Sequence, residues 1–306
     1  MAHDIIIVGA GPAGLTASIY AARAGMDVVV LEKSMPGGYV ALTDIIENYP
    51  GFPDGIKGIE LAEKMKKQAL RFEVDIVGTE VKKIEASPPT FQVQTSSQPY
   101  AAPAVIIATG TSPRKLLIPG EEELRGRGVS YCATCDGPLF KDRKVAVIGC
   151  GNSGLQEGHF LLNFAKDVVF VEYLTRITAD KVLQNKFEHE DRARFILGAM
   201  LVSINGKDKV ESITVKKRSD NSEETVAVDG VFIFVGTTPA SECVQGIVEL
   251  DKHGFVVTNQ DLETSVKGLY AAGDIRAKHI RQVVTACGEG TEAAINAYHY
   301  VESLHV

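Results

Sequence analysis

One glycine-rich segment occurs twice in this chain of 306 residues. The equivalent positions, each displaced by 140 residues, are Gly9 and Gly149, Gly11 and Gly151, Gly14 and Gly154, and Glu32 and Glu172. Because an internal repeat is the signature of a repeated supersecondary unit, the chain is expected to fold into two copies of one unit.

Each copy carries the residues that a dinucleotide-binding unit needs. An apolar strand, at 5–8 or 145–148, leads into a turn whose first glycine permits the sharp bend. The second glycine lets the backbone approach a pyrophosphate, and the third lets the following helix pack on the strand. The N-terminus of that helix presents N–H groups to the phosphates. A second strand then ends at Glu32 or Glu172, placed to accept hydrogen bonds from ribose hydroxyls.

Strand and helix patterns alternate along the chain, which predicts an α/β fold with two Rossmann-like domains. Residues 79–106 and 201–235 are rich in alternating apolar residues, so each domain is expected to carry an added antiparallel layer. A glycine turn followed by a proline ends each of these stretches, near 113 and 239. We therefore expect the second domain, 113–243, to be inserted into the first, 1–112 plus 244–306.

A pair of cysteines, Cys132 and Cys135, lies between the two fingerprints with Asp136 beside it. Zinc binding would need a second Cys or His pair at ligand spacing. The other three cysteines are isolated and the histidines form no such pair, so we expect no metal site. A redox-active dithiol is favoured over a purely structural pair, and the alternative role for Asp136 is a cap or turn residue.

Charge and hydropathy exclude several classes of function. The net charge of −7 argues against general nucleic-acid binding, which requires a concentrated basic face. No apolar run approaches the roughly 18 residues of a membrane span, and the first residues show no signal-peptide pattern. We therefore expect a cytoplasmic protein that does not enter a membrane.

A third informative string runs from Gly268 to Asp274 and is followed by a glycine-containing helix from Arg281 onward. Together with Gly9–Gly14, Ala108–Gly110 and Cys132–Asp136, it makes the sequence similar to the low-molecular-weight thioredoxin reductases over nearly the entire chain. The family is a class of flavoproteins.

The resemblance implies FAD in the first domain, a redox-active disulfide in the second, thioredoxin as the substrate, and a homodimer. It also implies that the second domain rotates during turnover. The residues expected at FAD are Gly9, Gly11, Pro12, Ala13, Gly14, Glu32, Lys33, Gly37, Gly38, Asn48, Ala108, Thr109, Gly110, Gly273, Asp274, Arg281, Gln282 and Val283. Tyr39 departs from the glutamine that usually follows the two glycines. By the same resemblance, Cys135 faces the flavin, Cys132 attacks the substrate disulfide, and Asp136 transfers protons.

The second fingerprint departs from the NADPH-dependent members. It ends in glycine instead of alanine, and no His-Arg-Arg run follows Glu172. Glu172 would repel a 2′-phosphate, so NADPH is not expected as an efficient donor. The nearby Arg176 is more readily interpreted as a surface charge than as a phosphate ligand.

Two donors remain open. NADH would bind at Gly149, Gly151, Asn152, Ser153, Gly154 and Glu172. Alternatively, the unit keeps its glycines for packing only and a ferredoxin-type protein supplies electrons, as in the flavin thioredoxin reductases. Substitutions after the loop, Gly158 among them, point slightly towards impaired nicotinamide binding.

A function of another class is a non-catalytic flavin-binding module whose dithiol senses redox state. The acid beside the dithiol favours catalysis, because a sensor needs a disulfide but no proton-transfer partner.

Overall fold

The computed structural model describes residues 2–87 and 89–304, which divide into two compact units. The first unit comprises 1–112 and 238–306, and the second 113–237. The chain passes between them at β10 (Thr111–Pro113) and β19 (Thr237–Pro239), which pair in a two-stranded sheet. We expected the return near 243. The chain instead returns to the first unit at 238, and Cys243 and Val244 are buried in the core of that unit.

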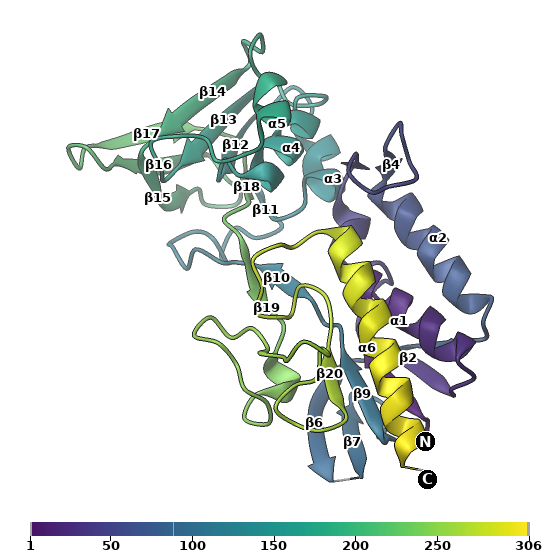
Figure 1. Ribbon diagram of the computed structural model, residues 1–306. Coiled ribbons are helices and arrows are strands. Elements are labelled where there is room, and N and C mark those ends of the chain that lie inside the picture. The colour runs from purple at the N-terminus through teal and green to yellow at the C-terminus, as the bar shows by residue number, and fades with distance from the viewer. Residues whose placement is uncertain (1, 88, 305–306) are drawn as a thin grey trace. The chain divides into compact units, whose positions relative to one another are not determined.

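The first unit contains a parallel five-stranded sheet in the order β20-β9-β1-β2-β5, of which β2, β9 and β20 are labelled in Figure 1. The strands are β1 (Ile5–Val8), β2 (Val28–Glu32), β5 (Asp75–Gly78), β9 (Ala104–Ile107) and β20 (Leu269–Ala271). The α-helices are α1 (Pro12–Arg23), α2 (Gly58–Leu70) and α6 (Val283–Ser303), and a short hairpin pairs β3 (Ile45–Ile46) with β4 (Ile56–Lys57). The expected antiparallel layer is β6 (Val81–Ser87), β7 (Thr90–Thr95) and β8 (Tyr100–Ala102). Two 3₁₀ turns, η1 (Gly38–Leu42) and η3 (Glu242–Val244), complete the unit.

Alternation along β1 builds a core on each face of this sheet. Ile5 and Ile7 pack in one cluster with the alanines of α1 and α6, whereas Ile6 and Val8 pack in another with the antiparallel layer. All four side chains are buried, because successive side chains of a strand point to opposite faces and both faces are covered.

The second unit repeats this plan with a parallel sheet in the order β11-β18-β12-β13-β14. The strands are β11 (Val129–Ser130), β12 (Lys144–Ile148), β13 (Asp167–Glu172), β14 (Ala193–Leu197) and β18 (Gly230–Ile233). The helices are α3 (Ala133–Asp136), η2 (Gly137–Phe140), α4 (Asn152–Leu161) and α5 (Lys181–Asn185). The antiparallel layer is β15 (Ala199–Asn205), β16 (Ser212–Lys217) and β17 (Glu223–Ala227). The predicted α/β class and the two added layers are confirmed.

Within 2–87 and 89–304, none of the helices combines the length and apolar character needed to cross a membrane.

Candidate active site

The first fingerprint forms a tight turn between β1 and α1. Gly9 has φ +105°, and a β-carbon there would lie 2.4 Å from the carbonyl oxygen of Ala108. A β-carbon on Gly14 would lie 1.9 Å from the carbonyl oxygen of Gly9, so only glycine allows this packing. Gly11, in contrast, faces open space. The turn therefore leaves room for a ligand only at its second glycine.

The amino end of α1 is prepared for a phosphate. The helix begins after Gly11, with Pro12 in its first turn and no side-chain cap from the described residues. Its first N–H groups are therefore left for an anion. At the end of β2, Glu32 is buried, accepts a hydrogen bond from the N–H of Ala10 at 2.7 Å and one from the N–H of Ser34 at 2.8 Å. These bonds fix its carboxylate at the ribose end of the expected site.

Six of the remaining residues expected at FAD follow the carboxyl ends of parallel strands, which meet at one edge of the sheet. They are Lys33 after β2, Ala108, Thr109 and Gly110 after β9, and Gly273 and Asp274 after β20. Gly37 and Gly38 lie at the start of η1, and Val283 begins α6. Asn48 and Gln282 are brought together, because the Asn48 amide donates to Oε1 of Gln282 at 3.0 Å.

Buried polar atoms at this edge fit a bound dinucleotide. Thr109 Oγ1, Asp274 Oδ1 and Arg281 Nε are buried without a hydrogen-bond partner among the described residues. Arg281 is held by stacking on Phe255, with its guanidinium carbon 4.1 Å from the ring centroid. Buried polar atoms normally have partners, and the hydroxyl, phosphate and ring atoms of FAD would supply them here. The residues present therefore fit FAD.

The second fingerprint has nearly the same geometry as the first. Gly149 has φ +102°, and a β-carbon on Gly154 would lie 1.9 Å from the oxygen of Gly149. Glu172 is buried and accepts hydrogen bonds from the N–H of Cys150 at 2.7 Å and of Leu174 at 2.9 Å. The duplication is thus preserved in the turn itself as well as in the sequence.

The start of α4 differs from the start of α1. Asn152, in its first turn, donates to Oδ2 of Asp180 at 2.8 Å and accepts from the N–H of Asp180 at 2.7 Å. A carboxylate is therefore held beside the helix end that would bind phosphates, where negative charge competes with an anionic ligand. Ser153, in the same turn, is exposed.

The structure shows the surroundings of two residues that follow the second fingerprint, Arg176 and Gly158. Arg176 is exposed, as a surface charge would be. Packing explains why position 158 is a glycine, because a β-carbon there would lie 2.4 Å from two ring atoms of Phe170. The glycine therefore says nothing about ligand binding.

An arginine distant in sequence reaches the loop after Glu172. The guanidinium carbon of Arg218 lies 4.1 Å from the ring centroid of Tyr173, and its NH1 donates to the Tyr173 carbonyl at 3.3 Å. Sequence reasoning missed this residue, because it follows β16 and only the antiparallel layer brings it here.

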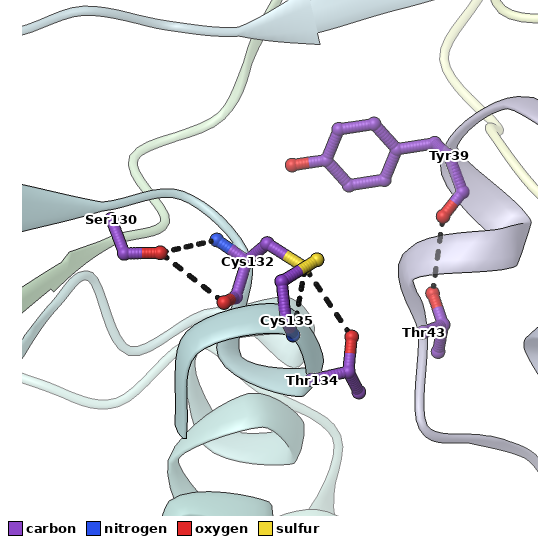
Figure 2. The surroundings of a disulfide bond; sticks show 6 residues. All are labelled: Tyr39, Thr43, Ser130, Cys132, Thr134 and Cys135. Carbon is purple, nitrogen blue, oxygen red and sulfur yellow. Dashed lines mark hydrogen bonds between the residues drawn. A yellow bond between two sulfur atoms is a disulfide. The ribbon is translucent and has the colours of Figure 1, made fainter. Parts of the chain in front are cut away.

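The dithiol pair is joined as a disulfide in the second unit (Figure 2). The Oγ of Ser130, at the end of β11, accepts from the N–H of Cys132 at 3.0 Å and donates to its carbonyl at 3.2 Å. The Sγ of Cys132 accepts from the N–H of Cys135 at 3.2 Å and lies 3.3 Å from Oγ1 of Thr134. Cys132 thus has donors directed at its sulfur, whereas Cys135 is exposed.

Asp136 is the last residue of α3 and is half-buried beside this disulfide. Its N–H donates to the carbonyl of Cys132 at 3.2 Å, which closes the single turn. The backbone therefore holds Asp136 in the same helical turn as the two cysteines.

A buried carboxylate anchors the segment before the dithiol. Glu121 is 2% exposed and accepts hydrogen bonds from the Tyr131 hydroxyl at 2.6 Å and from the N–H groups of Leu116 and Leu117. Burial, together with Glu121, raises the pKa of Tyr131 well above its usual value. Sequence reasoning missed Glu121, because its partners are set by the loop and not by a motif.

Groups of three or more His, Cys, Asp or Glu side chains able to hold a metal do not occur within the described parts of the chain.

Comparison with known proteins gives three kinds of match. The family model of the pyridine nucleotide-disulphide oxidoreductases matches residues 3–290. A curated thioredoxin reductase from Listeria innocua is 42% identical over 303 residues, which cover 99% of this chain and 95% of that protein.

Solved structures give the same result. The crystal structure of Lactococcus lactis thioredoxin reductase has a TM-score of 0.96 at 36% identity and covers 98% of this chain and 99% of that one. A ferredoxin-flavin thioredoxin reductase from Clostridium acetobutylicum has a TM-score of 0.54 at 34% identity, covering 99% and 98%.

Proposed function

The chain belongs to the pyridine nucleotide-disulphide oxidoreductase family, and on this premise we propose that it reduces thioredoxin through Cys132 and Cys135. It is an FAD-dependent disulfide oxidoreductase. The observation that carries the proposal is the Cys132–Cys135 disulfide, with hydrogen-bond donors at one sulfur and Asp136 following Cys135 in the same turn.

The first unit would hold the cofactor through the turn at Gly9–Gly14, the carboxylate of Glu32 and the buried polar atoms of Thr109, Asp274 and Arg281. Bound FAD supplies the transfer of an electron pair from the donor to the disulfide. Close backbone packing leaves no space beside Gly9 and Gly14, whereas Gly11 faces open space. A pyrophosphate would therefore approach this turn at Gly11.

We assign the attack on the substrate to Cys132. When the pair is reduced, the N–H of Cys135 and the hydroxyl of Thr134 are in place to stabilise a thiolate at Cys132. The Cys132 thiol first gives its proton to Asp136, and the resulting thiolate attacks the substrate disulfide and forms a mixed disulfide. The substrate sulfur that leaves then takes this proton back from Asp136.

Cys135, exposed on the same turn, completes the exchange. Its thiolate attacks Sγ of Cys132, restores the Cys132–Cys135 disulfide and releases the second substrate thiol. Bound FAD would supply the two electrons that reduce the restored disulfide again, and the family resemblance implies that Cys135 would be the cysteine that receives them.

NADH is the proposed donor. The buried carboxylate of Glu172 is held by two backbone N–H groups at the ribose end of the second fingerprint, where a 2′-phosphate would meet a second negative charge. A free 2′-hydroxyl can instead donate a hydrogen bond to it.

A ferredoxin-type donor is the second candidate, favoured by a specific contact. The carboxylate of Asp180, bonded to Asn152, stands at the helix end where the pyrophosphate of a nicotinamide cofactor would bind. The similar Clostridium acetobutylicum protein is a ferredoxin-flavin thioredoxin reductase.

Anaerobic stopped-flow absorbance tests the proposal on the purified FAD-loaded protein. Mixing with NADH should bleach the flavin quickly, and mixing with NADPH should bleach it slowly. Bleaching by reduced ferredoxin but by neither nucleotide would select the second donor. Reduction of the flavin without any thioredoxin turnover would select the redox sensor and overturn the enzyme.

The proposal also includes the homodimer that the family resemblance implies. Light scattering coupled to size-exclusion chromatography of the FAD-loaded protein tests it, and a monomer mass would overturn it.

A further inference from the structure

A network of charged side chains surrounds the turn after β20. Glu289, on α6, accepts a hydrogen bond from the N–H of Gly273 at 2.8 Å through Oε2. Its Oε1 contacts Nζ of Lys278 and NH1 of Arg276, both at 2.9 Å. Glu289 thus ties two cations and the backbone before Asp274 to one helix.

The three side chains of this network are largely buried although all of them carry charge. The side chains of Lys278, Glu289 and Arg276 are 12%, 15% and 16% exposed, and Arg276 also donates to Thr258 at 2.9 Å. Buried charges persist only where they are paired, and here each cation has a carboxylate partner. The network is therefore a built feature of the unit.

Asp274 differs from these three side chains. Its side chain is 35% exposed, yet its Oδ1 atom is buried and has no hydrogen-bond partner among the described residues. The nearest cation is Nζ of Lys278, at 3.7 Å from that oxygen, which is an ion-pair distance and not a hydrogen bond. Oδ1 therefore retains its capacity to accept a hydrogen bond from a ligand.

The charges around Asp274 shift the pKa of its carboxyl group in opposite directions. Burial raises the pKa of Asp274, and the charge of Glu289 adds to this effect. Lys278 and Arg281 lower the pKa and are the cations that face the carboxyl group, with Arg276 further back on Glu289. Removing the cation closest to Oδ1 would therefore let the pKa rise further.

We propose that Lys278 is a positioning residue that keeps Asp274 ionised, so that its carboxylate accepts a hydrogen bond from FAD across the neutral pH range. The inference rests on the proposed function for the identity of the cofactor. An ionised acceptor makes the stronger hydrogen bond, and a protonated Asp274 would lose it. Lys278 would thus make FAD affinity insensitive to pH without contacting the cofactor.

Reconstitution of the full-length apoprotein with FAD, followed by flavin fluorescence, tests this without any turnover. In wild type the dissociation constant should change little between about pH 8 and about pH 6. In Lys278→Met it should weaken by up to about tenfold as the pH falls across that interval, because Asp274 without its nearest cation is protonated more readily.

Three further variants identify the titrating group. Lys267→Met removes an exposed lysine that also pairs with an acid four residues away, Glu263, and should leave the pH profile of wild type unchanged. Asp274→Asn should bind FAD more weakly at every pH, with a flat profile. The double variant Asp274→Asn, Lys278→Met should be equally flat.

The outcomes separate this inference from the proposed function. Failure of wild type to bind FAD would overturn the proposed function itself. A wild-type pH profile in Lys278→Met, or a slope that persists in the double variant, would overturn the role of Lys278 alone. If Lys278→Met does not fold, Lys278→Gln must show the same slope, and Lys278→Arg must restore the flat profile.

Discussion

The carboxylate of Glu172 accepts a hydrogen bond from the backbone N–H of Cys150 at 2.7 Å, and Glu32 makes the same bond to Ala10 at the same distance. The two acids thus occupy equivalent places in two turns. Because each is buried and fixed by backbone donors, each presents its negative charge at the ribose end of its fingerprint.

Glu172→Gln should weaken the discrimination against NADPH. The substitution removes the charge while keeping one acceptor oxygen, so the ratio of kcat/KM for NADPH to that for NADH should rise by roughly tenfold. Steady-state assays with both nucleotides measure the ratio. Glu32→Gln is the matched control, since it should reduce FAD retention without changing the ratio. An unchanged ratio in Glu172→Gln would show that its charge does not select the donor.

Cys135→Ser and Cys132→Ser should behave differently towards thioredoxin. The first variant keeps the attacking sulfur but cannot resolve the product, so it should accumulate a mixed disulfide with thioredoxin. The second should form none. Mass spectrometry after acid quenching of pre-reduced protein distinguishes the two. A mixed disulfide between Cys135 and thioredoxin in the Cys132→Ser protein would reverse the proposed roles. As a control for folding, both variants should retain FAD.

Cys150 should be unreactive in the folded protein despite its place next to the second fingerprint. Burial first, and then the charge of Glu172, raises the pKa of its thiol to about 12. Burial likewise raises the pKa of Cys243 to about 11. Because the thiolate is the reactive form, iodoacetamide at neutral pH should label Cys132 and Cys135 of the reduced protein long before these two. Peptide mapping measures the rates, with a denatured sample as the control.

The thiol of Cys150 should also make the free energy of unfolding depend on pH. Its folded pKa of about 12 lies above the ordinary value of 9.0, so the folded state favours the protonated form. The contribution of Cys150 is complete below about pH 9 and is lost as the pH rises towards about 12. Urea unfolding at about pH 8 and about pH 10.5 should therefore show a larger loss in wild type than in Cys150→Ser. Equal losses would contradict the buried-thiol explanation.

Gly158→Ala should destabilise the second unit although alanine favours helices. The new β-carbon would collide with Phe170 at 2.4 Å, and overpacking of this kind costs about 1–3 kcal/mol. Gly288→Ala, on α6, is the matched control, because no atom lies within 4 Å of its β-carbon and a gain of roughly 0.5–1 kcal/mol is expected. Thermal unfolding of both FAD-loaded variants measures the difference. A Tm for Gly158→Ala at or above that of wild type would contradict the packing argument.

The α/β class, the two fingerprints and the dithiol were accessible from the sequence because their signals are local. Gly14 is separated by only a few residues from the atom that requires glycine there, the carbonyl oxygen of Gly9, and the alternation in β1 assigns each side chain to a face. The acids at the ends of β2 and β13 followed from the spacing of the repeat.

The tertiary structure alone decided which distant side chains meet. The contacts of Asn48 with Gln282, of Asp180 with Asn152 and of Lys278 with Glu289 join separate elements. The interpretation of Gly158 as a hint of impaired nicotinamide binding was superseded by its close packing against Phe170 of β13. The sequence by itself thus determined two nucleotide turns and a redox pair, because backbone conformation depends on neighbouring residues. Which charges surround Asp274 and Glu172 depended on how helices and sheets pack, and that packing has no local pattern.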